Sequence, residues 1–155
     1  YIYLERLGKI KNKFNLDDCK DYKSFRDKLE LSSVSVIFSS YFINKPASAF
    51  GHTLLKLNKV NPMTSDLNSY GVDFSAQVTT KNPFAYGVLG ILGGFYGRFS
   101  LLPYFLKLRE YNDFESRDLW EFELNLNQSD LDLLTAHLWD MNHAQFDYYY
   151  FTENC

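Results

Sequence analysis

The hydrophobic pattern changes from a period of two to a helical period near the C-terminal end of the chain. The segment "RDLWEFELNLN" alternates strictly, and alternation of this kind predicts a half-buried antiparallel strand. Its apolar face would carry Trp120, Phe122, Leu124 and Leu126, and its polar face Glu121, Glu123 and Asn125. The next segment, "SDLDLLTAHLWDMNH", has the period of an amphipathic helix, with Ser129 as its expected N-cap.

The earlier part of the chain predicts two helices followed by three strands. Residues 1–13 and 17–30 have helical patterns, and "SSVSVIFSSYF" is rich in β-branched and apolar residues, which predicts a strand over Ser33–Phe42. Two more strands are predicted over residues 51–58 and 69–78. The order of helices, strands and helix favours an α+β fold, with an antiparallel sheet and flanking helices.

The segment from Phe84 to Phe105 does not fit either period. It holds five of the eight glycines, and no charged residue occurs between Asn82 and Gly97. Because glycine is unfavourable inside helices and strands, we expect irregular structure here. Two interpretations remain open, a buried core loop or an apolar loop that lines an acyl-chain pocket or touches a membrane surface.

Size and charge narrow the class of protein. The 155 residues are 46% hydrophobic and 18% aromatic, which suits a single folded domain over residues 1–155. The net charge of -3 argues against nucleic acid as a partner. The two cysteines and three histidines lack the spacing of a metal site, so we expect neither metal nor cofactor. The hydrophobic pattern starts and stops abruptly, which suggests a fragment that lacks the signal segment and the C-terminal part of a longer parent protein. We expect activity of the parent protein, and not necessarily of the fragment.

His52 is the histidine whose surroundings suggest chemistry. It opens an apolar strand, and the small residues before it, Ala47, Ser48, Ala49 and Gly51, leave room beside its ring. The distant Cys155 follows a short polar cluster, and a cysteine at a helix start next to an imidazole forms a thiolate readily. Asp73, in the strand after His52, is the natural residue to orient the ring. The residues alone favour a disulfide or an inert buried thiol over a catalytic pair, and the two cysteines, Cys19 and Cys155, could form that disulfide.

Several blocks of the sequence, in order, resemble one family. They are "NKPASAFGHTLLKL", "SYGVDFSA", "GFYGRFSLLPYFLKLREYNDFESRDLWEFELNLN" and "HLWDMNHAQFDYYYFTENC". The chain resembles the N-terminal periplasmic domain of Lnb-type lipoprotein transacylases over roughly residues 15 to 155. The order of His before Cys is similar to that of circularly permuted papain-like and NlpC-like proteins.

The resemblance implies roles for individual residues. His52 of the FGHT block would be the general base, and Cys155 of the ENC block the nucleophile. Asp73 stands where the family often has Asn, and Asn154 would assist the oxyanion or fix the cysteine turn. We add Tyr41 and Ser48, in the segment before His52, as candidate contacts with substrate or oxyanion.

The resemblance also implies a function. Family members move an acyl chain from the glyceryl ester to the N-terminal amine of a bacterial lipoprotein. The expected partners are a lipidated lipoprotein N-terminus and a membrane surface, in the periplasm or another extracytoplasmic compartment, with the parent protein membrane-associated. Two other functions remain open: a papain-like amidase or peptidase acting on cell-envelope peptides, and a non-catalytic envelope module with Cys155 in a disulfide, which a Cys19–Cys155 bond would favour.

Overall fold

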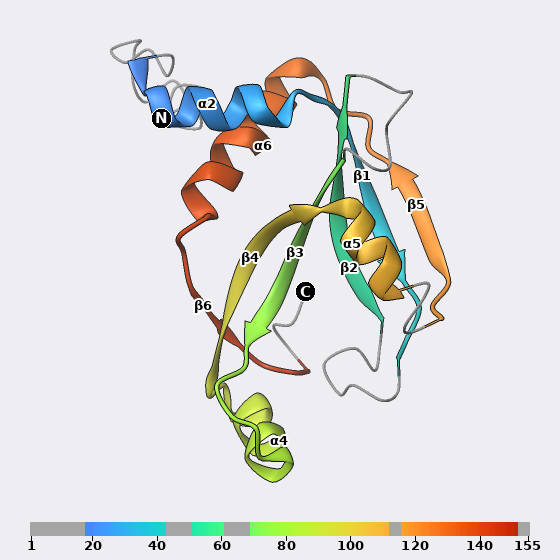
Figure 1. Cartoon of the computed structure of the whole chain (residues 1–155), viewed down its shortest axis with the longest axis vertical. Coiled ribbons are helices and arrows are strands. Elements are labelled where there is room, and N and C mark those ends of the chain that lie inside the picture. The colour runs from blue at the N-terminus through green and yellow to red at the C-terminus, as the bar shows by residue number, and fades with distance from the viewer. Residues whose placement is uncertain (1–17, 43–50, 61–68, 112–115, 152–155) are drawn as a thin grey trace.

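The computed structural model describes residues 18–42, 51–60, 69–111 and 116–151 (Figure 1). Within these ranges the fold is α+β with a six-stranded antiparallel sheet, which confirms the predicted class. The strands are β1 (Leu31–Ser39), β2 (His52–Lys59), β3 (Tyr70–Gln77), β4 (Phe95–Pro103), β5 (Leu119–Glu123) and β6 (Phe146–Tyr148). The helices are α2 (Lys20–Leu29), α4 (Pro83–Leu92), α5 (Tyr104–Arg109) and α6 (Gln128–Met141). The helix predicted over residues 1–13 lies outside the described residues.

The sheet has the strand order β5-β1-β2-β3-β4-β6. Its centre is a meander, because β1, β2, β3 and β4 follow one another both in the chain and in the sheet. The two outer strands come from the C-terminal part of the chain and pair with β1 and β4. The three strands predicted over Ser33–Phe42 and residues 51–58 and 69–78 are therefore confirmed as β1, β2 and β3, and the structure shows that they are neighbours in the sheet.

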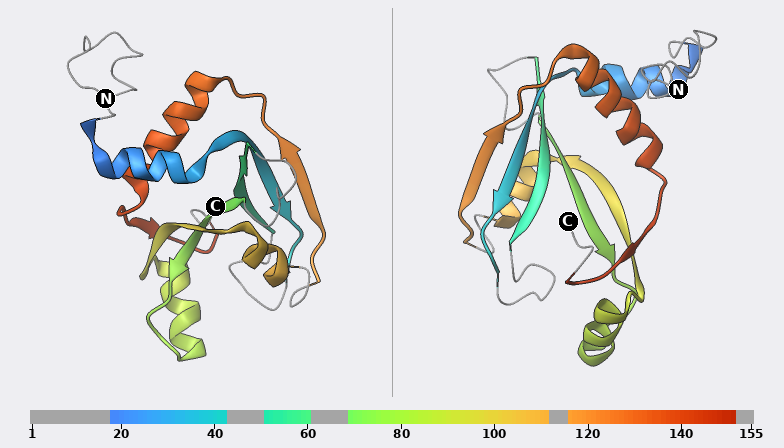
Figure 2. Two further views of the ribbon diagram at one scale, coloured as in Figure 1. Left: turned by 45° about the horizontal axis from the view of Figure 1, so that its top comes forward. Right: turned by 180° about the vertical axis from the view of Figure 1, so that it is seen from behind.

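Helices cover the two faces of the sheet unequally (Figures 1 and 2). On one face, α2 and α6 close a core around Val34, Leu57 and Val72, to which they contribute Leu29, Leu131 and Leu138. On the other face, the short helix α5 covers a smaller apolar cluster of Ile37, Leu54, Tyr104 and Tyr111. Since α5 is only six residues long, much of this second face is left to polar side chains.

The hydrogen-bonded ladder between β2 and β3 is short. It runs over three pairs and ends at Leu55 and Val72. Beyond that pair the two strands separate, as Figure 1 shows. His52 and Asp73 lie on the far side of this point, on the face that α5 covers.

The strand β5 corrects one prediction. Its alternation is real, but the face predicted to be buried is largely exposed, with Trp120 45% and Phe122 59% accessible. The reason is that β5 is an edge strand, beyond the reach of α2 and α6. Only the residues after it, Leu124 and Leu126, pack against the larger core.

The glycine-rich segment corrects a second prediction, because it forms α4, β4 and the start of α5. The Asn82 side chain caps α4 by accepting hydrogen bonds from two backbone N–H groups, and Pro83 starts the helix with a favourable φ. Gly93 ends it in the left-handed conformation, at φ +76°. Gly90 allows close packing, because a Cβ there would lie 2.1 Å from the ring of Tyr150.

The helix α6 was predicted correctly, but its cap was not. Asn127, two residues before Ser129, is the N-cap and forms a reciprocal capping box with Asp130. Within the described residues, no helix is long and apolar enough to cross a membrane.

Candidate functional site

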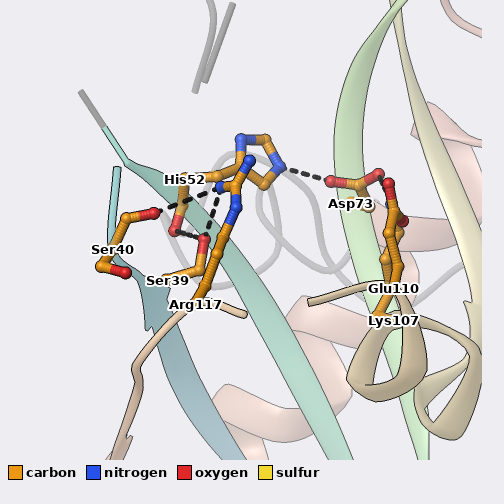
Figure 3. Close-up of polar contacts among 7 residues, drawn as sticks. All are labelled: Ser39, Ser40, His52, Asp73, Lys107, Glu110 and Arg117. Atoms are coloured by element: carbon orange, nitrogen blue, oxygen red, sulfur yellow. Dashed lines mark hydrogen bonds and ion pairs between the residues drawn. The ribbon is translucent and has the colours of Figure 1, made fainter. Parts of the chain in front are cut away.

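A hydrogen bond between His52 and Asp73 joins β2 to β3 just past the end of their ladder. The His52 Nε2 lies 2.5 Å from the Asp73 Oδ1 (Figure 3). The two side chains are 11% and 4% accessible, so the bond is largely shielded from water. When Nε2–H donates to the carboxylate, Nδ1 carries the ring's lone pair and is the nitrogen that can accept a proton.

The glycine before His52 is required by the backbone at the start of β2. Gly51 has φ +98°, a conformation that side chains with a Cβ rarely adopt. A Cβ there would also lie 2.8 Å from the carbonyl oxygen of Ser39 and 2.9 Å from the ring of Phe38. The close approach of β1 to Gly51 therefore fixes the backbone position from which the imidazole of His52 extends.

Arg117 supports the same strand end from the other side of β1. Its Nη1 donates to the Ser39 Oγ at 3.1 Å and to the Ser40 carbonyl at 3.3 Å (Figure 3). The Ser39 hydroxyl in turn donates to the carbonyl of His52 at 3.3 Å. Arg117 is 5% exposed, so this chain of bonds fixes the backbone of His52 from within the fold.

Lys107 of α5 contacts the second oxygen of Asp73. Its Nζ lies 2.7 Å from Asp73 Oδ2 and 3.0 Å from Glu110 Oε2. The helix begins at the buried Tyr104, and Lys107 lies one turn further on the same side, which directs its ammonium group toward β3. Asp73 is thus held between His52 and Lys107, one partner on each oxygen.

These contacts keep Asp73 ionised. Burial alone would raise the pKa of Asp73, but the hydrogen bond and charge of His52, together with the charge of Lys107, outweigh it and lower the pKa to about 2. Burial has the opposite effect on Lys107, whose pKa it would lower, but the charge of Asp73 outweighs burial and raises the pKa of Lys107. At neutral pH the site therefore presents a carboxylate to the imidazole.

An open cleft of about 430 Å³ lies on the same face of the sheet, beside the smaller core. Its lining includes Lys56, Arg117, Asp118 and Glu121. Lys56 is 6% exposed, bonds to both oxygens of Glu121 at 3.1 and 3.2 Å, and lies over the ring of Tyr104. The cleft is therefore polar and carries charges of both signs.

The structure places some of the predicted site residues and not others. It brings together His52 and Asp73, whereas Cys155, Asn154 and Ser48 lie outside the described residues, and their roles stay predictions. Tyr41 is 68% exposed, two residues beyond the end of β1, at the end of the sheet where His52 begins β2. Among the described residues, no group of three or more potential ligands is arranged to hold a metal ion.

The sequence did not identify Lys107 or Arg117 as residues of the site. Arg117 is buried and the Lys107 side chain is 13% accessible, and both cations reach the site from outside β2 and β3. The available signal was a lysine within the apolar run "LLPYFLKL", because a charged residue surrounded by apolar ones needs a buried partner. Nothing in the sequence indicated that this partner is Asp73, since α5 and β3 meet only through the fold.

The fold and the site together define a class: an α+β domain in which a histidine at the start of one central strand is oriented by a carboxylate on the next. The model of the Lnb N-terminal periplasmic domain matches residues 21–155, well over half of the chain, and the chain belongs to that family. It is thus related to the Lnb envelope proteins, and the family description confirms the predicted extracytoplasmic location. Comparison with curated proteins and with solved structures gave no significant match.

Proposed function

We propose that this domain carries the catalytic residues of a cysteine-dependent acyltransferase that acts on bacterial lipoproteins, moving an acyl chain from the glyceryl ester to the N-terminal amine. The observation that carries the proposal is the shielded 2.5 Å hydrogen bond between His52 Nε2 and the ionised Asp73. Such a pair fixes the tautomer that a general base needs. Membership of the Lnb family supports the envelope context.

In the proposed reaction, His52 Nδ1 takes the proton from the Cys155 thiol, and the thiolate attacks the ester carbonyl of the lipidated cysteine. The tetrahedral intermediate collapses with loss of the glyceryl oxygen, which receives the proton from the imidazolium. This step leaves an acyl thioester on Cys155 and a free hydroxyl on the glyceryl group. The α-amine of the lipoprotein then attacks the thioester, His52 takes up the amine proton, and the thiol is regenerated as the amide forms.

Asp73 stabilises the imidazolium formed in both half-reactions, because its negative charge lies against Nε2. Lys107 keeps Asp73 in place and ionised without contacting the reacting atoms. Asn154 is proposed to stabilise the oxyanion, and Tyr41 and Ser48 to contact the substrate. The permuted papain-like arrangement, with the histidine before the cysteine, is part of the same proposal.

The polar cleft favours a second candidate function, an amidase or peptidase that acts on cell-envelope peptides. A cleft with charges of both signs suits a peptide better than an acyl chain. The same His52–Asp73 pair would then activate Cys155 against an amide, and water would replace the α-amine in the second step.

The non-catalytic alternative loses one of its supports. It invoked a Cys19–Cys155 disulfide, whereas Cys19 is a free and exposed thiol at the start of α2.

The test is conversion of a diacylglyceryl lipoprotein to its N-acylated lyso form, followed by mass spectrometry of the N-terminal lipopeptide. Cys155→Ala and His52→Ala should each lower the rate at least about 100-fold, and the double variant should be little worse than either. Cys19→Ser and His143→Ala serve as matched controls and should retain the rate of the unsubstituted protein. Release of free peptide fragments without N-acylation would instead support the amidase.

A further inference from the structure

The helix α4 projects from one end of the sheet (Figures 1 and 2). It is anchored on one side, where Tyr86 and Leu89 pack against the cluster of Phe95, Tyr148 and Tyr150. The Tyr150 backbone N–H donates to the carbonyl of Gly90 at 2.9 Å, and its hydroxyl donates to the carbonyl of Tyr86 at 3.3 Å. The helix is therefore a preformed element held firmly by the C-terminal segment.

The opposite side of α4 is apolar and exposed. Phe84 is 82% accessible and Leu92 72%, and Ile91 and Val88 lie between them at 55% and 38%. Their spacing of i, i+4, i+7 and i+8 places all four on one face, about 180° from the anchored side. A well-capped helix with a second apolar face in water indicates an interaction surface.

Charge at this end of the molecule favours lipid as the occupant. No acidic residue occurs from residue 74 to residue 109, although the whole chain has a net charge of -3. The exposed Lys81 precedes α4, and Asp147 of β6, opposite Tyr96, is a nearby acidic residue. Arg98 of β4 is half-buried and donates through Nη2 to the carbonyl of Asn142 at the end of α6. The segment from residue 74 to residue 109 thus carries basic but no acidic side chains, and an exposed lysine at the start of an apolar helix suits the headgroups of anionic phospholipids.

The side chains of α4 also favour lipid over a protein partner. Protein interfaces surround their apolar centre with polar groups that supply specificity. The exposed face of α4 has no such group, and two tyrosines lie at its C-terminal base: Tyr96 is 57% exposed, and the ring of Tyr149 lies over Gly93. Tyrosine beside an apolar segment is typical of the membrane–water interface.

We propose that α4 is an interfacial anchor, whose face of Phe84, Val88, Ile91 and Leu92 inserts into the outer part of a phospholipid bilayer. The sheet topology also relates α4 to the candidate site. This part of the inference rests on the proposed function. Because β2 and β3 are antiparallel, the end of β3 that leads to α4 is the end of the sheet where His52 begins β2. Insertion of α4 would bring that end, with the His52–Asp73 pair, to the surface from which a lipidated substrate must come.

The experiment is co-flotation of the chain with vesicles of phosphatidylcholine and phosphatidylglycerol. The parent chain should float with the vesicles, and the Phe84→Ser/Ile91→Ser double variant should lose about tenfold or more in partitioning. Phe122→Ser is the matched control, since Phe122 is an equally apolar residue, 59% exposed, on the edge strand β5 at the other side of the sheet. It should float like the parent chain.

Two results would overturn the anchor: no flotation of the parent chain, or equal loss in the Phe122→Ser control. A dimer in sedimentation equilibrium that the Phe84→Ser/Ile91→Ser variant abolishes, without vesicle binding, would assign the face to a second copy instead. Flotation needs no catalysis and is repeated with Cys155→Ala. Flotation without acyl transfer would thus refute the proposed function alone, and acyl transfer on detergent-solubilised lipoprotein without flotation would refute the anchor alone.

Discussion

His52 and Asp73 lie on neighbouring strands, yet their side chains meet where the backbone ladder between those strands has already ended. A side-chain hydrogen bond of 2.5 Å joins the two strands beyond the last backbone pair of that ladder. The imidazole is therefore oriented by a buried carboxylate and, through its backbone, by Ser39 and Arg117. This arrangement leads to the predictions that follow.

Two replacements of Asp73 should separate its orientation of the His52 ring from the effect of its negative charge. In Asp73→Asn the amide oxygen can still accept from Nε2–H, so acyl transfer should fall less than in Asp73→Ala, where the ring has no acceptor. Both variants should keep more activity than His52→Ala, because an orienting residue contributes less than the base itself. Steady-state rates of N-acylation for the three variants test this order of activities. A rate for Asp73→Ala at or below that of His52→Ala would contradict an orienting role.

Acid should destabilise the domain through Asp73. The pKa of this carboxyl is lowered from 3.8 to about 2 in the folded state, so its ionised form stabilises the fold above pH 4. That contribution, about 2 kcal/mol, should be lost as the pH falls from 4 toward 2. Denaturant unfolding from pH 6 to pH 2 measures it. The free energy of unfolding of Asp73→Asn should fall less steeply over this window, and parallel curves for the two proteins would contradict the assignment.

Lys107 should act on the site through Asp73. Lys107→Met keeps the length of the side chain but removes the charge, so the pKa of Asp73 should rise above about 2. Carbon-detected NMR titration of the Asp73 carboxyl reports that pKa directly. The control is Lys59→Met, because Lys59 pairs at 3.5 Å with Glu30, a largely exposed carboxylate away from the site. An Asp73 titration that is the same in Lys107→Met and Lys59→Met would refute the coupling.

Two glycines of α4 should respond to the same substitution with opposite signs. A Cβ at Gly90 would meet the Tyr150 ring at 2.1 Å, so Gly90→Ala should destabilise the domain by about 1–3 kcal/mol. A Cβ at Gly87 meets nothing within 4 Å, and Gly87→Ala should stabilise the helix by about 0.5–1 kcal/mol. Urea unfolding of the two variants measures both effects. Equal effects of the two substitutions would show that Tyr150 does not anchor α4.

The sequence predicts most of the central sheet, because β1, β2 and β3 have strong local patterns. It also predicts that His52 and Asp73 belong together, since they lie on consecutive strands. It does not predict α4, because the cost of glycine in a helix is offset by tertiary contacts, such as the ring of Tyr150 on Gly90. The exposure of Phe122 depends on strand order, which an alternating pattern does not specify. Lys107 was missed for a similar reason, because only the fold brings α5 to β3.

If His52 activates Cys155 as a nucleophile, a covalent acyl-enzyme on Cys155 is the most direct consequence. The measurement is intact-protein mass spectrometry after brief incubation with a diacylglyceryl lipopeptide whose α-amine is blocked, so that the second half-reaction cannot proceed. We predict a mass increase of one acyl group, mapped to Cys155, released by hydroxylamine, and absent from both Cys155→Ala and His52→Ala. An adduct on Cys19, or N-acylation of the unblocked lipopeptide by Cys155→Ala at the parent rate, would contradict it.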